Sequence, residues 1–228
     1  MTRRLRIAVA GAGRMGSSIA ARLGQHTDLE LAGTWRRGGD LGALAAGADV
    51  IVDFSLPEGT AEVLAVAVRL DKPLVCGVSG LDASQLRALT VAAETIPLVY
   101  DRNMSQGITV LEAAILAAAG ALGGDFAVVI EETHHVHKKD APSGTALKLG
   151  EAIAAVRGDD AIEYRSERRG EVPGDHTVVF RSPTETLSFA HSVTTRDVFA
   201  DGALRAARWV AAGRAPGRYT MRDVLFGA

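Results

Sequence analysis

Short apolar runs and longer amphipathic segments alternate along the first hundred residues. The apolar runs are continuous and bounded by glycine or polar residues, which is typical of strands buried on both faces of a parallel sheet. The runs are Ile7–Ala10, Leu29–Thr34, Val50–Phe54, Leu74–Gly77 and Leu98–Tyr100. Helical patterns lie between them at Met15–Leu23, Thr60–Leu70 and Asp82–Thr95, with Asp82 placed to cap the last helix. This alternation predicts an α/β fold, a doubly wound parallel sheet of the Rossmann type with helices on both faces.

The pattern changes after Asn103. Gly107–Leu122 is almost entirely apolar and predicts a helix that is buried on most sides. The elements that follow are predicted as a strand at Phe126–Thr133, a helix at Ser143–Val156, antiparallel strands at Thr177–Phe180 and Thr186–His191, a helix at Gly202–Ala212 and an apolar tail at Tyr219–Phe226. The polar stretch Gly158–Gly174, which contains Arg165, Arg168 and Arg169, is interpreted as a loop. Together these elements predict a second, smaller α+β domain.

Composition excludes several classes of protein. The 228 residues are 47% apolar and 23% charged, which provides a sizeable core. The formal net charge of −2 lacks the basic excess of a nucleic-acid-binding protein. The single cysteine, Cys76, rules out an intrachain disulfide or a cysteine-based zinc site and is typical of a reducing cytosol. No apolar run approaches the roughly 20 residues of a membrane span or the core of a signal peptide, so we expect a cytoplasmic protein that binds neither membrane nor nucleic acid.

A glycine motif follows the first predicted strand. Its residues are Gly11, Ala12, Gly13, Arg14, Met15 and Gly16, and they match G-x-G-x-x-G between a strand and a helix. In this motif the first glycine makes a tight turn, the second lets the backbone approach a pyrophosphate, and the third lets the helix pack on the strand. The free N–H groups at the helix start face the anion, so the motif predicts a dinucleotide site.

The end of the second strand favours NADPH over NADH. An acid at this place normally binds the ribose 2′-hydroxyl of NAD. This chain has no acid there and instead has Arg36 and Arg37 after Trp35. Guanidinium groups suit a 2′-phosphate, although the two arginines are also compatible with a solvated turn.

Two further segments lie at the carboxyl ends of predicted parallel strands, where such sheets bind ligands. One contains Gly77, Val78 and Ser79, and the other contains Asp101, Arg102, Asn103 and Met104. Neither segment is specific by itself, but the Asn103 side chain has the chemistry to bond a nicotinamide amide.

The clearest chemical signal lies between Glu131 and Ala146. His134 and His135 point to opposite faces if the strand continues, and a histidine is the usual general acid near neutral pH. Lys138 adds a positive charge and a proton. Ser143, Gly144 and Thr145 open a helix, and its free N–H groups and dipole predict a site for a small carboxylate. A metal site is disfavoured because the loop is rich in lysine and lacks a helical histidine pair.

These motifs together resemble the 4-hydroxy-tetrahydrodipicolinate (dihydrodipicolinate) reductase family of the diaminopimelate route to lysine. The resemblance extends over nearly the whole chain, and its most specific part is the block from His134 to Ala146. Further matching segments are Gly11–Gly16, Asp53–Ser55, Gly77–Gly80, Thr195–Arg196, Phe199–Leu204 and Tyr219–Leu225. The resemblance implies NAD(P)H-dependent reduction of a small dicarboxylate, 4-hydroxy-tetrahydrodipicolinate, to tetrahydrodipicolinate.

The resemblance also implies a domain division and residue roles. Residues 1–105 would form the dinucleotide-binding domain, residues 106–200 a mixed-sheet domain for substrate binding and oligomerisation, and residues 201–228 would return to the first domain. His134 would be the general acid and Lys138 the second proton donor, while His135, Gly144 and Thr145 would contact substrate. Cofactor contacts would fall at Gly11–Gly16, Gly77–Ser79 and Asp101–Met104, and the protein would form a homotetramer.

The chain departs from the family pattern at four places. Its glycine loop is one residue shorter than usual, and Met104 replaces a common phenylalanine. Trp35 stands where relatives often have an acid, which favours NADPH over NADH. The segment between Gly170 and His176 is shorter than in typical members and lacks a strand of the sheet that relatives use for oligomerisation.

Two alternative functions are compatible with the sequence. One is a related Rossmann reductase for an aldehyde or another imino acid, which would work without a dicarboxylate. The other is a sensor that binds NADPH without consuming it, as the short segment before His176 suggests. The intact set of His134, Lys138 and Ser143 argues against the sensor.

Overall fold

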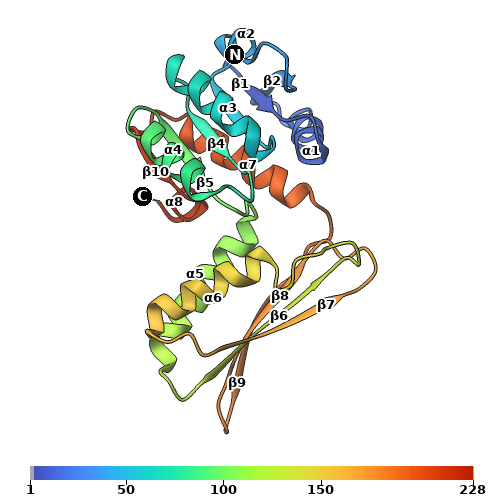
Figure 1. Cartoon of the computed structure of the whole chain (residues 1–228), viewed down its shortest axis with the longest axis vertical. Helices are drawn as coiled ribbons and strands as arrows, with labels where there is room; N and C mark the ends of the chain where they lie inside the picture. Colours follow the sequence, from blue (N-terminus) through green and yellow to red (C-terminus); the bar gives the residue numbers. More distant parts are fainter. Residues whose placement is uncertain (1–2, 228) are drawn as a thin grey trace. The chain divides into compact units, whose positions relative to one another are not determined.

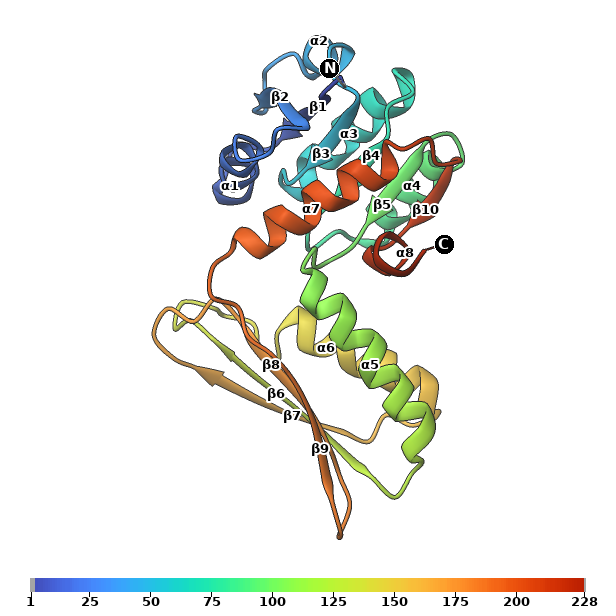
Figure 2. The same cartoon turned by 180° about the vertical axis from the view of Figure 1, so that it is seen from behind.

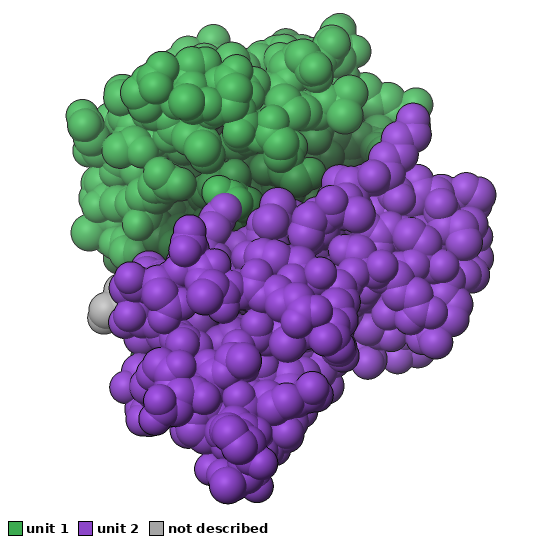
Figure 3. Space-filling view, turned by 60° about the horizontal axis from the view of Figure 1, so that its bottom comes forward, with its two compact units in different colours: residues 1–106, 197–228 green, residues 107–196 purple. Residues whose placement is uncertain are grey.

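The computed structural model describes residues 3–227, which fold as two compact units (Figure 3). Unit 1 contains the chain up to Gln106 together with the chain from Asp197 onward. Unit 2 contains Gly107–Arg196. The chain therefore passes between the units twice, and its last segment returns to the unit in which it began.

Unit 1 is built on a six-stranded parallel sheet (Figures 1 and 2). Its strands lie in the order β10-β5-β4-β3-β1-β2. Their bounds are β1 (Leu5–Ala10), β2 (Leu29–Trp35), β3 (Val50–Asp53), β4 (Leu74–Cys76), β5 (Pro97–Tyr100) and β10 (Gly217–Tyr219). The helices are α1 (Arg14–Leu23), α2 (Leu41–Ala46), α3 (Pro57–Arg69), α4 (Ala83–Ala93), α7 (Asp197–Val210) and α8 (Met221–Phe226). The predicted doubly wound α/β fold is confirmed.

Successive residues of β1, β3, β4 and β5 in unit 1 belong to different cores. Ala8 packs with α2, α3 and α4, whereas Ile7 and Val9 pack with α1, α7 and α8 on the opposite face. All three side chains are fully buried. Burial on both faces explains why the strands appear in the sequence as continuous apolar runs without alternation.

Helix α7 is part of the unit 1 core although it comes late in the sequence. Gly202 lets it approach the chain at Met104 closely, because a Cβ at 202 would lie 1.7 Å from the Met104 carbonyl oxygen. Two arginine–aspartate pairs also connect distant parts of the unit: Arg22 bonds both oxygens of Asp201, and Arg208 bonds both oxygens of Asp28.

Unit 2 has a mixed four-stranded sheet in the order β7-β6-β8-β9. Its strands are β6 (Ala127–His134), β7 (Ile162–Arg168), β8 (Asp175–Arg181) and β9 (Thr186–His191), and its helices are α5 (Gln106–Leu122) and α6 (Gly144–Arg157). Strand β6 pairs in parallel with β7 and antiparallel with β8. Residues of α5 and α6 pack with alternate residues of β6 and β8 in a third core. This agrees with the expected mixed-sheet α+β architecture.

Several element predictions need correction. The interpretation of Gly158–Gly174 as a loop is wrong, because residues 162–168 form strand β7. This strand lies at the sheet edge and is mostly exposed, so it lacks the apolar alternation that marks a half-buried strand. Helix α2 and strand β10 were not predicted, and α7 begins five residues before Gly202. The predicted Asp82 cap is confirmed, within a capping box. Among residues 3–227, no helix is both long and apolar enough to cross a membrane.

Candidate active site

The glycine loop in unit 1 has the geometry of a phosphate-binding turn. Gly11 has a φ of +105°, and a Cβ there would lie 2.5 Å from the Phe54 carbonyl oxygen. A Cβ at Gly16 would lie 1.7 Å from the Gly11 carbonyl oxygen, so α1 packs on the turn only with glycine at 16. Gly13 has no atom within 4 Å of its Cβ position. The open backbone at Gly13 is the place where a pyrophosphate would approach the start of α1.

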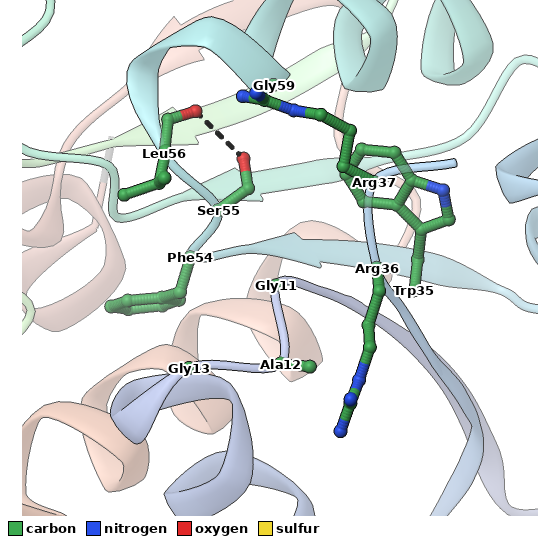
Figure 4. A pocket seen from close by; sticks show the side chains of 10 residues that line it. All are labelled: Gly11, Ala12, Gly13, Trp35, Arg36, Arg37, Phe54, Ser55, Leu56 and Gly59. Carbon is green, nitrogen blue, oxygen red and sulfur yellow. Dashed lines mark hydrogen bonds between the residues drawn. The ribbon is translucent and has the colours of Figure 1, made fainter. Parts of the chain in front are cut away.

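A pocket of about 420 Å³ adjoins this turn (Figure 4). Its lining consists of Gly11, Ala12, Gly13, Trp35, Arg36, Arg37, Phe54, Ser55, Leu56 and Gly59. The side chains of Arg36 and Arg37 extend in different directions from the end of β2, and Trp35 lies beside Arg37. Trp35 donates a 3.0 Å hydrogen bond to the Gly39 carbonyl, and the Arg37 guanidinium lies 3.5 Å from the Glu58 carboxylate. The pocket thus combines an open phosphate turn with two exposed guanidinium groups.

The other predicted cofactor residues lie outside this lining. The first turn of α1 contains Arg14, Met15 and Gly16. The segment after β4 contains Gly77, Val78 and Ser79, and the segment after β5 contains Asp101, Arg102, Asn103 and Met104. Val78 and Met104 are each only 2% exposed. The side-chain oxygen of Asn103 accepts a 2.8 Å bond from the Ser105 amide. All of these residues therefore lie at one edge of the unit 1 sheet, after the carboxyl ends of β1, β4 and β5.

A buried carboxylate supports the turn between β3 and α3. Asp53 is completely buried, and one of its oxygens accepts a 2.8 Å bond from the Ser55 amide. Its other oxygen, Oδ2, has no hydrogen-bond partner. Burial raises the pKa of Asp53 from 3.8 to about 6. Asp53 therefore fixes the backbone that carries the pocket residues Phe54 and Ser55.

The second candidate site is at the end of β6 in unit 2. The His134 ring is mostly buried, and its Nδ1 contacts the Glu132 carboxylate, which lies two residues earlier on the same face of the strand. Arg168 on β7 binds both Glu132 oxygens at 3.0 Å. The parallel register places Arg168 directly opposite His134. Sheet pairing thus links Arg168, Glu132 and His134 by hydrogen bonds, although Arg168 lies 36 positions after Glu132.

Arg168 also holds the loop that follows β6. Its Nε donates to the Lys138 carbonyl at 3.3 Å, and an Nη donates to the Asp140 carbonyl at 2.5 Å. In this loop the Lys138 ammonium forms a 2.8 Å ion pair with the Asp140 carboxylate. The hydrogen bond from Lys138 lowers the pKa of Asp140 below 3.8. Lys138 is thereby held beside the His134 strand end, whereas Lys139 is exposed.

The start of α6 is connected to the same cluster. Ser143 is 1% exposed and caps the helix by accepting a bond from the Ala146 amide. Its hydroxyl also lies 3.1 Å from Nε2 of His176 on β8, whose ring packs edge-on against His134 at 5.2 Å between centroids. Burial lowers the pKa of His176 from 6.5 to about 4, so this histidine is neutral near pH 7.

The remaining predicted substrate residues lie around this helix start. Gly144 is exposed and has no atom within 4 Å of its Cβ position. Thr145 is half-buried in the first turn. His135 is half-buried and its ring lies 6.1 Å from that of His137. The first turn of α6 thus lies next to the lysine and histidine above, and the Gly144 amide bonds the Asp140 carboxylate of the same loop.

The electrostatics of the cluster keep its carboxylate ionised. Burial by itself would raise the pKa of Glu132, but hydrogen bonds from Arg168, Ser166 and His134 outweigh it, and the pKa lies below 4.5. Burial lowers the pKa of His134 below 6.5, and the bond to Glu132 partly offsets that decrease. The arrangement can therefore hold His134 in one orientation beside an ionised carboxylate.

Sequence reasoning did not assign roles to Glu132, Arg168 and His176. Glu132 was recognisable from the two-residue period that puts it on the same strand face as His134. Arg168 and His176 gave no local signal, because their positions depend on the pairing of β6 with β7 and β8. Within residues 3–227, no cluster of three or more His, Cys, Asp or Glu side chains is arranged to hold a metal ion.

Comparison with known proteins identifies the family. The model of the dihydrodipicolinate reductase N-terminus matches residues 5–104, and that of the C-terminus matches residues 107–225. The chain is 43% identical to the 4-hydroxy-tetrahydrodipicolinate reductase of Xylella fastidiosa, over 97% of this chain and 98% of that protein. It is 49% identical to the reductase of the same name from Stenotrophomonas maltophilia, over 78% of this chain and 72% of that protein.

Solved structures show the same fold. A dipicolinate-bound dihydrodipicolinate reductase from Paenisporosarcina sp. TG-14 aligns with a TM-score of 0.84 at 22% identity, over 97% of this chain and all of that one. A meso-diaminopimelate dehydrogenase variant from Clostridium tetani aligns with a TM-score of 0.62 at 11% identity, over 98% of this chain and 95% of that one. At these identities the likeness concerns the fold alone.

Proposed function

The chain belongs to the dihydrodipicolinate reductase family, and from this membership we propose that it reduces 4-hydroxy-tetrahydrodipicolinate to tetrahydrodipicolinate. It is an NAD(P)H-dependent oxidoreductase, and the reaction is the reductive step of the lysine and diaminopimelate route. The observation that carries the proposal is in unit 2, where an acid-paired histidine, a lysine and the start of helix α6 lie together. Unit 1 would bind the dinucleotide and unit 2 the substrate.

The residues of unit 2 suit a planar dicarboxylate. The start of α6 presents the positive end of a helix dipole, which favours the binding of one substrate carboxylate. Lys138 adds a compact positive charge that bonds carboxylates well. In support, a related protein of the same fold is described as dipicolinate-bound. Ser143 and His135 would complete the substrate contacts.

His134 and Lys138 are proposed as the proton donors. The bound nicotinamide supplies a hydride, and the substrate then carries an electron pair that needs a proton. His134, held on Nδ1 by Glu132, is proposed to deliver that proton. Lys138, held by the Asp140 carboxylate, would be the second donor and would stabilise the developing negative charge.

NADPH is proposed as the preferred cofactor, with NADH as a weaker substitute. Arg36 and Arg37 are exposed at the end of β2 and line the pocket beside the phosphate turn. No acid occupies the place where a ribose 2′-hydroxyl would be bound, since the strand ends in Trp35. The remaining contacts would come from Gly11–Gly16, Gly77–Ser79 and Asp101–Met104.

The deciding experiment is a coupled assay in which the upstream synthase generates fresh substrate. We expect NADPH oxidation that requires the synthase product, and slower oxidation of NADH under the same conditions. The His134→Gln variant should bind NADPH normally, by fluorescence titration, and lose about 10²–10⁴-fold in kcat. NADPH binding without oxidation would instead support a sensor, and oxidation without the dicarboxylate would support a different Rossmann reductase.

The assembly and the compartment are also proposals. Family membership supports a homotetramer, and the buried free thiol of Cys76 is compatible with the reducing cytoplasm. Light scattering of the purified protein tests the assembly, and a monomeric mass under assay conditions would contradict it.

A further inference from the structure

We propose that Glu132, fixed by Arg168, is a positioning residue that directs His134 Nδ1–H toward its carboxylate and leaves Nε2 to deliver the proton. The inference rests on the proposed function, in which His134 is the general acid. It adds two residues to the machinery and states what each does.

The contact between Glu132 and His134 is built into strand β6. The two residues are separated by one position, so both side chains point to the same face of the strand. The Glu132 side chain is 1% exposed and the His134 side chain 10% exposed, which excludes most competing water. A buried carboxylate that contacts a buried imidazole nitrogen forms a charge-assisted hydrogen bond, among the stronger kinds in proteins.

Arg168 prevents the Glu132 carboxylate from rotating. Its two Nη atoms bind the two carboxylate oxygens at 3.0 Å each, in the fork geometry that a lysine cannot reproduce. The same guanidinium donates to the carbonyls of Glu167, Lys138 and Asp140. Five hydrogen bonds of one side chain thus tie the carboxylate to the adjacent strand and to the loop that carries Lys138.

The carboxylate determines which imidazole nitrogen carries the proton. Ionised Glu132 only accepts hydrogen bonds, so Nδ1 of His134 must be the donor. The other nitrogen, Nε2, faces Gly174, where a Cβ would lie 2.9 Å away. Only glycine at 174 lets the chain pass this close to the ring, because a side chain there would collide with Nε2. Nε2 is the atom left to act on a ligand.

The proton transfer balances without any change at Glu132. In the acid form, His134 carries protons on both nitrogens. After hydride addition, the Nε2 proton passes to the substrate atom that holds the new electron pair. His134 is then neutral with Nδ1–H still bound to the carboxylate, and Nε2 takes its next proton from water.

The charges around His134 give Glu132 a measurable effect on pH dependence. Arg168 from β7 and Lys138 from the loop are cations that disfavour the imidazolium, and His176 from β8 adds no negative charge. Glu132 from β6 supplies the negative charge that favours it. Replacing this carboxylate by an amide therefore lowers the pKa of His134, and the acid form is lost at a lower pH.

The test compares Glu132→Gln with Glu131→Gln as a matched control. Glu131 is the preceding residue on the same strand, points to the other face and pairs with Arg165. For Glu132→Gln we expect the basic limb of kcat/KM to move down by about one pH unit or more, because charge-assisted bonds of this kind shift a pKa by that much. We also expect a 10- to 100-fold lower kcat with little change in the substrate KM. For Glu131→Gln we expect the wild-type profile.

A spectroscopic measurement tests the positioning without using activity. Nitrogen-15 NMR of the histidines, with the His134 signals assigned by the His134→Gln variant, should show Nδ1 protonated in the neutral wild-type ring. In Glu132→Gln the His134 pKa should be lower. The Glu132→Asp variant keeps the charge, so its basic limb should stay within about half a unit of wild type although kcat falls. If Glu132→Gln fails to fold, the pH profile of Glu132→Asp still tests the positioning role of Glu132.

The outcomes separate the inference from the proposed function. If wild-type protein does not oxidise NADPH with the synthase product, the proposed function fails, and the NMR result still decides the positioning. The inference is overturned if Glu132→Gln leaves the His134 pKa unchanged, if neutral His134 carries its proton on Nε2, or if Glu131→Gln shifts the basic limb equally. It is also overturned if Glu132→Asp shifts the basic limb downward by a full unit.

Discussion

Two adjacent lysines in the loop after β6 have different surroundings. The Lys138 side chain is 22% exposed and pairs with Asp140, and its carbonyl is held by Arg168. Lys139 is exposed. Chemically similar residues next to each other can therefore have different effects on activity, because only one is fixed within the candidate site.

We expect Lys138→Ala to reduce kcat by about 10²–10³-fold, since it removes a proton donor and a positive charge near the substrate. Lys139→Ala is the matched control and should change kcat less than about twofold. Steady-state kinetics in the coupled assay measure both. Equal, small losses in the two variants would contradict the role assigned to Lys138.

Asp53 makes the free energy of unfolding fall as the pH rises, whereas most carboxylates make it rise. Burial raises its pKa from 3.8 to about 6, so the folded protein holds the proton more tightly than the unfolded chain. The contribution of Asp53 to stability is therefore fully present below pH 3.8, and it is lost as the pH rises through the folded pKa of about 6. The full effect is about 3 kcal/mol.

The Asp53→Asn variant removes this titration. Between pH 4.5 and 7.5, we expect the stability of wild type relative to the variant to fall by about 2 kcal/mol, measured by urea unfolding at both pH values. Asp125→Asn, in the exposed loop before β6, is the control and should run parallel to wild type. A difference between wild type and Asp53→Asn that does not depend on pH would contradict the raised pKa.

At the scale of elements, the end of β2 places two arginines in the lining of the pocket beside the glycine turn. The strand ends with Trp35 directed inward, 3% exposed, and the next two side chains are exposed arginines. Arg37 has a carboxylate neighbour in Glu58 on α3, whereas Arg36 extends away from it along the pocket (Figure 4). Arg36 is therefore the guanidinium more readily available to a phosphate.

We expect Arg36→Ala to raise the KM for NADPH about 10- to 100-fold, the usual effect of losing a hydrogen bond to a charged group. The KM for NADH should change less than about twofold, because NADH lacks the 2′-phosphate. Arg87→Ala on α4, outside the pocket lining, is the control. Parallel increases for both cofactors would exclude a specific contact with the 2′-phosphate.

At the scale of the molecule, the chain order and the unit order differ. Residues from Asp197 onward follow unit 2 in sequence but belong to unit 1. Leu204 on α7 is completely buried and packs in the same core as Val9 and Val52 of the first strands. The C-terminal segment therefore stabilises the unit formed by the N-terminal half.

We expect Leu204→Ala to destabilise unit 1 by about 2–5 kcal/mol, the usual range for a buried leucine. Hydrogen exchange should show faster exchange in β1–β5 and unchanged exchange in β6–β9. Leu187→Ala on β9, where the leucine is 40% exposed, is the control and should leave β1–β5 unchanged. Faster exchange of β6–β9 alone in Leu204→Ala would contradict the assignment of α7 to unit 1.

The sequence by itself determined the local features. The apolar runs identify β1, β3, β4 and β5 because strands buried on both faces need continuous apolar residues. The glycine spacing identifies the turn at Gly11 because backbone there has a positive φ and no room for a side chain. The block from His134 to Thr145 identifies the candidate substrate site because its residue types carry the chemistry.

Only the tertiary structure decided which distant residues meet. Edge strand β7 buries only Ile162 and Tyr164 in part against the third core, so most of its residues are polar and it appears as a loop until its pairing with β6 is known. That pairing places Arg168 beside Glu132 and His134, and the pairing of β8 places His176 beside Ser143. Which strands become neighbours depends on contacts between segments far apart in the chain, and the local sequence of β6 does not show that its partners are β7 and β8. The local sequence therefore determined which reactive residues the candidate site contains, whereas the pairing of β6 with β7 and β8 determined how they are arranged.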